Sequence, residues 1–166
     1  MKRILVIGCP GAGKSVFSIK LNNVTGIPVV HLDNLYWKPD GSVIPKEEFL
    51  CRLKSELDKE SWIIDGNYLS TMELRLSKCD TVFFFDLPTE TCLEGICSRI
   101  GHTRPDIPWV EQEIDPEFGN FVRRYNADTR PTVESLLMKF SSLRIIRINS
   151  REQSDGFIDI IKNEQL

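Results

Sequence analysis

The amino-acid sequence predicts an α/β fold in which one parallel β-sheet lies between two layers of helices. Five short apolar segments carry this prediction, at 2–7, 28–31, 61–65, 80–86 and 143–148. Their near-continuous apolar content is typical of strands covered on both faces, and each segment ends near polar or turn residues. Segments with helical spacing separate them, which indicates right-handed crossovers and an open, doubly wound sheet. A ligand is then expected at the carboxyl ends of the strands.

The intervals between these strands carry helical signals. Apolar residues recur at i, i+3, i+4 and i+7 over 93–100 and again over 133–140. Pro45 is expected to open a helix, Thr89 to cap one, and Ser154 to cap the last one. No repeat or Gly/Ser-rich linker interrupts the pattern, so we expect a single domain over residues 1–166.

A glycine-rich segment directly follows the first expected strand. Residues 8–15 match the phosphate-loop pattern G-x-x-x-x-G-K-[ST] in full. The glycines let successive backbone N–H groups face phosphate oxygens, and a helix beginning near Lys14 adds the positive end of its dipole. Lys14 would contact the β- and γ-phosphates, and the Ser15 hydroxyl would join the ligands of Mg²⁺. The segment therefore predicts binding of ATP with Mg²⁺.

The residues expected to bind the nucleotide are Gly8, Cys9, Pro10, Gly11, Ala12, Gly13, Lys14, Ser15 and Val16. A dinucleotide-binding fingerprint is excluded, because Val16 stands where its third glycine would be. Cys9 suggests a further hypothesis: neighbouring N–H groups and Lys14 would lower its thiol pKa and make nucleotide binding sensitive to oxidation.

Composition and charge narrow the class of protein. The chain has 166 residues and a formal net charge of −3, which gives no basic footprint for a nucleic acid, so direct DNA binding is not expected. The five cysteines are scattered and indicate a reduced, cytoplasmic compartment. No apolar run reaches the length of a membrane span, and the first residues lead straight into the phosphate loop rather than into a cleavable signal. A soluble monomer or dimer fits these features.

Carboxylates stand at the ends of three expected strands. Asp33 follows the second strand, where it can take a proton from an acceptor hydroxyl, hold a metal-bound water, or only cap a turn. Asp65 ends the third strand, and we favour it as the magnesium partner because Gly66 permits close approach of a ligand. Asp86 is the competitor, but the Leu-Pro that follows it indicates a strand exit. His31 is expected to be a packed, hydrogen-bonded residue rather than a ligand or base.

Charge on a moving phosphoryl group must be neutralised, so arginines are needed at the site. The irregular segment at about 101–119 is either a surface loop or a short lid, and it contains Arg104. Arg130 precedes a proline at a helix break and is expected, with Arg104, to reach the cleft. The wider set of candidates is Arg75, Arg99, Arg104, Arg123, Arg124 and Arg130.

These segments, in this order, resemble bacterial DNA topology modulation proteins of the FlaR-like kind, which are similar to short adenylate-kinase-related P-loop proteins. The resemblance covers nearly the whole chain, through 7–15, 31–39, 62–68, 72–76 and 130–131. It implies a P-loop NTPase sandwich of three layers, with a five-stranded parallel sheet in the order 2-3-1-4-5 and a short lid.

The resemblance also implies a cleft for a second substrate, with two departures from the adenylate-kinase pattern. Adenylate kinases follow Asp-Gly with Phe-Pro-Arg at the monophosphate site, whereas Asn67 and Tyr68 stand here and the nearest arginine is Arg75. The lid is also too short for a separate small domain.

The leading hypothesis is a kinase that moves the γ-phosphate of Mg-ATP to a small acceptor, with Lys14, Asp33, Arg104 and Arg130 in catalysis. The acceptor is expected to bind among Asp33, Tyr36, Trp37, Asn67, Tyr68 and Arg75. For a hydroxyl acceptor Asp33 is the base; for a nucleoside monophosphate Asp33 positions the acceptor and Arg75 holds its phosphate. Tyr36 and Trp37 would stack on a base or simply cover the core. The alternative is a nucleotide-dependent regulatory ATPase associated with DNA topology.

Overall fold

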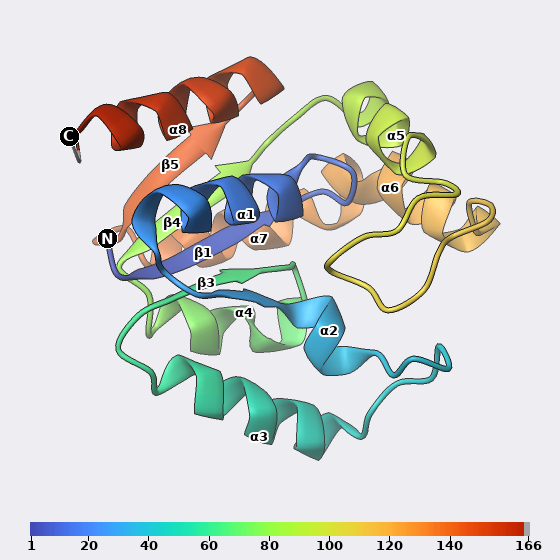
Figure 1. Ribbon diagram of the computed structural model, residues 1–166, viewed down its shortest axis with the longest axis horizontal. Coiled ribbons are helices and arrows are strands. Elements are labelled where there is room, and N and C mark those ends of the chain that lie inside the picture. Colours follow the sequence, from blue (N-terminus) through green and yellow to red (C-terminus); the bar gives the residue numbers. More distant parts are fainter. Residues whose placement is uncertain (165–166) are drawn as a thin grey trace.

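A parallel sheet forms the middle layer of the protein, as seen in a computed structural model that describes residues 1–164 (Figure 1). Its strands are β1 (Arg3–Gly8), β2 (Val29–His31), β3 (Trp62–Asp65), β4 (Thr81–Phe85) and β5 (Arg144–Ile148). The spatial order is β2-β3-β1-β4-β5, which confirms the expected α/β class and the order 2-3-1-4-5. Every predicted strand is present, and each differs from its predicted bounds by one residue at one end or at both ends.

Helices connect these strands. They are α1 (Lys14–Thr25), α2 (Leu32–Tyr36), α3 (Lys46–Leu57), α4 (Leu69–Leu76), α5 (Thr89–Cys97), α6 (Pro116–Asp128), α7 (Arg130–Lys139) and α8 (Arg151–Glu164). The spacing did not predict α2 and α4, because five and eight residues are too few to show a clear helical period. It also did not predict α6 as a helix.

Two helix caps differ from those predicted. Ser154 lies inside α8 and donates to the carbonyl of Arg151, while the hydroxyl of Ser150 accepts from the N–H of Gln153 at 3.1 Å. Thr89 is the first residue of α5, and Pro88 occupies the capping position. In both cases the helix begins earlier in the chain than the suggested cap implied.

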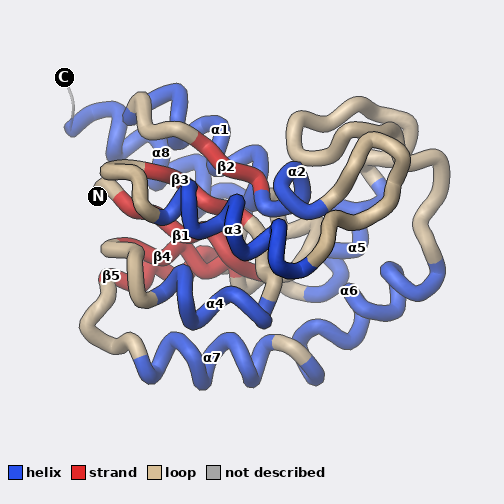
Figure 2. Tube along the Cα trace, turned by 90° about the horizontal axis from the view of Figure 1, so that it is seen from below, coloured by secondary structure: helices blue, strands red, loops and turns tan. Residues whose placement is uncertain are grey.

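Two apolar layers cover the sheet, one on each face. In β1, Ile4 and Val6 pack with residues of α1 and α8, whereas Leu5 and Ile7 pack with residues of α3, α4 and α7. Figure 2 shows α7 and α4 on one side of the strands and α1 and α8 on the other. Because successive side chains of a strand point to opposite faces, continuous apolar strands fill both layers at once.

The phosphate loop, residues 8–15, lies against β4 and α5 at the carboxyl ends of the strands. A Cβ on Gly8 would lie 2.3 Å from the carbonyl oxygen of Phe85, and one on Gly11 would lie 2.0 Å from that of Cys92. The contact is reciprocal, since a Cβ on Gly95 of α5 would lie 2.0 Å from the oxygen of Gly11. Only glycine allows the loop backbone and the α5 backbone to approach so closely.

The long segment between α5 and α6 and the short α2 lie at the same end of the sheet as the phosphate loop (Figure 1). In the described part of the chain, no helix has both the length and the apolar character needed to cross a membrane.

Two helical glycines give a matched test of the loop contact. Gly95→Ala should lower the free energy of unfolding by about 2 kcal/mol or more, because the added methyl group overlaps a backbone carbonyl. Gly156→Ala in α8 meets no atom within 4 Å and should instead stabilise by about 0.5–1 kcal/mol. Urea unfolding of both variants measures the difference, and equal stability of the two would contradict the packing described.

Candidate functional site

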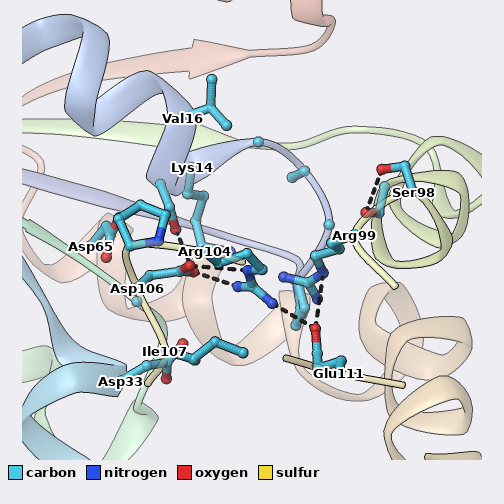
Figure 3. Close-up of a pocket in the computed structure, with 18 of the residues that line it drawn as sticks. Lys14, Val16, Asp33, Asp65, Ser98, Arg99, Arg104, Asp106, Ile107 and Glu111 are labelled. Atoms are coloured by element: carbon cyan, nitrogen blue, oxygen red, sulfur yellow. Dashed lines mark hydrogen bonds and ion pairs between the residues drawn. The ribbon is translucent and has the colours of Figure 1, made fainter. Parts of the chain in front are cut away.

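A cleft of about 1080 Å³ opens at the carboxyl ends of the strands (Figure 3). The phosphate loop, α1, α2, the loop after β3, α5, the segment between α5 and α6, and α8 all contribute to its walls. Lining residues that the sequence predicted are Pro10, Gly11, Ala12, Gly13, Lys14, Ser15, Val16, Asp33, Trp37, Asp65, Asn67, Tyr68, Arg99 and Arg104. The cleft therefore brings together most of the proposed nucleotide and acceptor residues.

The phosphate loop presents its backbone and one ammonium group to this cleft. Gly13 has φ 98°, and a Cβ placed there would meet no atom within 4 Å, so the space beside this residue is open. Lys14 Nζ donates to the carbonyl of Cys9 at 2.9 Å, and burial lowers the pKa of this lysine. The N–H of Gly8 donates to Asn67 Oδ1 at 2.9 Å, which ties the start of the loop to the loop after β3.

Ser15 and Asp65 supply hard oxygen atoms at the cleft. The Ser15 hydroxyl donates to Asp106 Oδ2 at 2.9 Å, and the Asp65 carboxylate receives His31 Nδ1 at 2.8 Å. The ion pair with Asp65 raises the pKa of His31 despite its burial. His31 is thus the packed, hydrogen-bonded residue that was expected. Within residues 1–164, no three His, Cys, Asp or Glu side chains form a group that could hold a metal by themselves.

Asp33 lines the cleft from α2. Tyr68 Oη donates to its Oδ1 at 2.7 Å, and burial raises the pKa of the carboxyl group. Tyr68 is the one residue other than glycine with positive φ in residues 1–164, at 31°. This unusual backbone conformation marks a loop whose shape is set by its surroundings. Asp33 is therefore a partly buried carboxylate whose side chain has one hydrogen-bond partner within residues 1–164, the neutral hydroxyl of Tyr68.

Aromatic side chains form a second part of the wall. The rings of Trp37 and Trp109 meet edge to face with centroids 5.6 Å apart, and both line the cleft. Tyr36 instead packs against Phe49 and Tyr68, at 5.4 and 5.1 Å, and does not line the cleft. Trp37 is thus available to a ligand, whereas Tyr36 covers the core.

Ion pairs hold the segment between α5 and α6 together, and the hydrogen bond from Ser15 to Asp106 joins it to the end of the phosphate loop. Arg104 binds Asp106 and, at 2.7 Å, Glu111, which also receives Arg99 at 3.8 Å. Figure 3 shows both arginines directed toward Glu111. Asn34 of α2 donates to the carbonyl of Pro105 at 2.8 Å. The last four residues of the expected lid, 116–119, belong to α6.

Arg75 does not reach the acceptor region, contrary to its predicted role. Its side chain is fully buried and donates to the carbonyls of Gly66 at 2.8 Å, Tyr68 at 3.0 Å, and Asn67. It is absent from the cleft wall, and burial lowers the pKa of its guanidinium to about 9. Arg75 therefore supports the loop after β3 from beneath instead of holding a phosphate.

Arg130 also lies outside the cleft, although it was expected to project into it. It binds both oxygens of Asp86, at 2.7 and 2.8 Å, in a network with Glu134 and Arg147. The carboxylate of Asp86 is held in this network and does not line the cleft, whereas Asp65, the residue favoured over it, does. The remaining candidates Arg123 and Arg124 are exposed on α6 and do not line the cleft.

Cys9 contradicts the hypothesis of a reactive thiol in the phosphate loop. It is 3% exposed, and contact with Cys92 together with burial raises the pKa of its thiol instead of lowering it. Cys9 and Gly8 do not line the cleft, so their part of the loop packs against the body of the protein.

Several residues that line the cleft were not predicted from the sequence. Asp106, Trp109 and Glu111 all lie in the irregular segment that was proposed as a lid. Nothing in the order of residues in that segment shows which side chains turn inward. Arg151 and Asp155 line the far wall from α8, a helix for which no site residue was predicted.

Comparisons with known proteins bear on the fold. The sequence matches no protein-family model and no curated protein. The structure is similar to shikimate kinase from Acinetobacter baumannii, solved in complex with shikimate, with 16% identity and a TM-score of 0.61. The match covers 100% of this chain and 96% of that chain. This likeness shows that the chain has the fold of a P-loop kinase.

The support role of Arg75 can be measured by stability. Arg75→Met should lower the free energy of unfolding by about 3 kcal/mol or more, since it leaves several buried carbonyls without donors. The control Arg124→Met removes an exposed pair with Asp128 and should change stability by less than about 0.5 kcal/mol. A loss for Arg75→Met no larger than the control's, in urea unfolding, would refute the role.

Proposed function

We propose that this protein is a phosphotransferase that moves the γ-phosphate of Mg-ATP to a hydroxyl group of a small molecule. The observation that carries the proposal is that Lys14 and Ser15 of the phosphate loop share one cleft with the partly buried carboxylate of Asp33. The fold, which is that of a P-loop kinase, supports the same class of reaction.

The phosphate loop would hold the donor. The inward backbone N–H groups and Lys14 would contact the β- and γ-phosphates, while α1 adds its dipole. Ser15 and Asp65 fit a magnesium ion because both present hard oxygen atoms at the cleft, the remaining ligands coming from phosphate and water. When bound, the ion neutralises charge on the phosphates.

Asp33 would act as the base. The acceptor O–H gives its proton to a carboxylate oxygen of Asp33 as the acceptor oxygen bonds to the γ-phosphorus, and the bond from that phosphorus to the bridging oxygen breaks to leave ADP. Burial raises the pKa of Asp33, which makes its carboxylate a better proton acceptor. The burial of Arg75 beneath the loop disfavours the monophosphate acceptor, because the cation assigned to it is elsewhere.

The segment at about 101–119 would serve as the short lid of this single domain. Arg104 binds Asp106 and Glu111 in it, and Asp106 also receives the Ser15 hydroxyl. A phosphate at Ser15 would compete with Asp106 and release Arg104 toward the transferred group. Arg104 is therefore proposed as the catalytic lid arginine, while Arg130 is assigned to its network with Asp86.

The proposal places the protein in the cytoplasm as a monomer or dimer that acts on a small molecule. The regulatory ATPase associated with DNA topology stays a prediction. It would require DNA retention that weakens with salt, and ADP formation that no small acceptor stimulates.

Lys14→Ala tests donor binding. The variant loses the ammonium group at the phosphates and should reduce kcat by about a hundredfold or more, measured as acceptor-stimulated ADP release. The exposed Lys59→Ala, which only loses a pair with Glu56, should retain full turnover. Normal turnover by Lys14→Ala would exclude the phosphate loop as the donor site.

Asp33→Asn tests the base. The loss of the proton acceptor should lower kcat by about 10²–10⁴-fold. In the wild type, kcat/KM should fall as pH drops through the raised pKa of Asp33, which lies above the ordinary 3.8, because the carboxylate then carries a proton. This acid limb should be missing in Asp33→Asn and unchanged in the exposed Asp58→Asn. A small loss with an intact acid limb would show that Asp33 only positions the acceptor.

A further inference from the structure

The wall of the cleft opposite the helix α5 carries carboxylate side chains, and its described lining residues include no lysine or arginine. This wall, here called the acceptor side, is formed by Asp33 of α2, Trp37 directly after α2, residues 65–68, residues 105–107 and residues 109–110. Figure 3 shows Asp33, Asp65 and Ile107 on it, with Ser98 and Arg99 across the cleft. The hydrogen bond from Asn34 to the Pro105 carbonyl joins α2 to the lid segment and makes the wall continuous.

Its carboxylates are only partly compensated. Asp65 is paired with His31 and Asp106 with Arg104, whereas Asp33 has only the neutral hydroxyl of Tyr68. Among the described residues of the acceptor side, none is a lysine or an arginine. The ammonium group of Lys14 also acts on Asp33 and Asp65, but in the proposed function it contacts the donor phosphates. An anionic group on the acceptor would therefore meet a negative field without a free cation to bind it.

The lining cations lie elsewhere or are already paired. Lys20 binds Asp155 at 2.7 Å, and Arg151 donates to the carbonyl of Thr91, both on the side of α1, α5 and α8. Arg99 and Arg104 share Glu111, and Arg104 is also paired with Asp106 of the acceptor side. These arginines are thus already neutralised by carboxylates and leave no unpaired guanidinium for an anion on the acceptor.

The same wall offers flat apolar surface. Trp37, directly after α2, and Trp109 of the lid segment stand edge to face with centroids 5.6 Å apart. Ile107, 8% exposed, belongs to the same lid segment as Trp109 and also lines the cleft. Rings of this kind stack on a planar group or hold an apolar face, and they attract a cation but not an anion.

We infer that the acceptor is a hydroxyl compound without a phosphate or carboxylate group, which places a flat or apolar face on Trp37 and Trp109 and its hydroxyl at Asp33. This inference rests on the proposed function and goes further, since it sets the charge and shape of the substrate. Shikimate, the carboxylate-bearing compound in the complex of the similar kinase, is therefore predicted to be a poor acceptor here.

Matched pairs of compounds test the charge directly. The pairs are adenosine and adenosine monophosphate, thymidine and thymidine monophosphate, and methyl shikimate and shikimate. Each is measured twice on the full chain: as acceptor-stimulated ADP release with Mg-ATP, and as quenching of tryptophan fluorescence with a non-hydrolysable ATP analogue. The uncharged member should have a kcat/KM, or an affinity, at least about tenfold higher, and the pair with the largest effect identifies the source of the ring or apolar face.

Variants of one ring test the shape. Trp109→Ala should raise the KM of the preferred acceptor about tenfold with little change in kcat or in the KM for ATP, and Trp109→Phe should restore most of the loss. A merely structural role would instead lower kcat, raise both KM values or reduce stability.

Three outcomes would overturn the inference. One is equal or better use of the anionic members, which contradicts the charge assignment while leaving the proposed phosphotransferase intact. Another is failure of all six compounds to bind or to stimulate ADP release while Mg-ATP still binds, which contradicts the assigned substrate class. If Mg-ATP itself does not bind the wild type, the proposed function fails with it.

Discussion

The close contact between the phosphate loop and α5 is the constraint on which the rest of the site depends. Gly11 and Gly95 approach so closely that a methyl group on either would overlap the backbone of the other element, and Gly8 is held in the same way against β4. This packing fixes the loop's backbone with its open side toward the cleft. A preformed set of N–H donors binds phosphate without first having to be ordered, which is the physical advantage of such a rigid loop.

The loop after β3, residues 66–68, lies beside the phosphate loop, and the buried guanidinium of Arg75 holds its backbone in place. Arg75 donates to the carbonyls of residues 66–68 from beneath, and Asn67 in that loop accepts the N–H of Gly8. The phosphate loop and the loop after β3 are therefore connected by a direct hydrogen bond. Tyr68, held with a positive φ, carries its hydroxyl to Asp33 and so fixes the carboxylate that would accept the proton.

The sequence predicted the sheet more fully than it predicted the cleft. Apolar strands and a glycine-rich loop are local patterns, so the strands and the phosphate loop could be found by inspection, and the strand order followed from a family resemblance. The positions and surroundings of Arg75, Arg130 and Cys9 depend on packing that local sequence patterns do not show. A buried arginine among carbonyls and a surface arginine have the same sequence signature. Asp106 and Trp109 were missed for the same reason, since an irregular segment gives no period from which to infer which side chains point inward.

The central claim is that the phosphate loop binds the phosphates of a nucleotide together with a magnesium ion. Isothermal titration calorimetry of the folded wild-type chain with ATP, in the presence and absence of Mg²⁺, tests it most directly. We expect one saturable site with a dissociation constant between about 1 μM and 1 mM, weakened when the cation is omitted. The absence of any binding heat with ATP or GTP at millimolar Mg²⁺, at more than one temperature, would contradict the account.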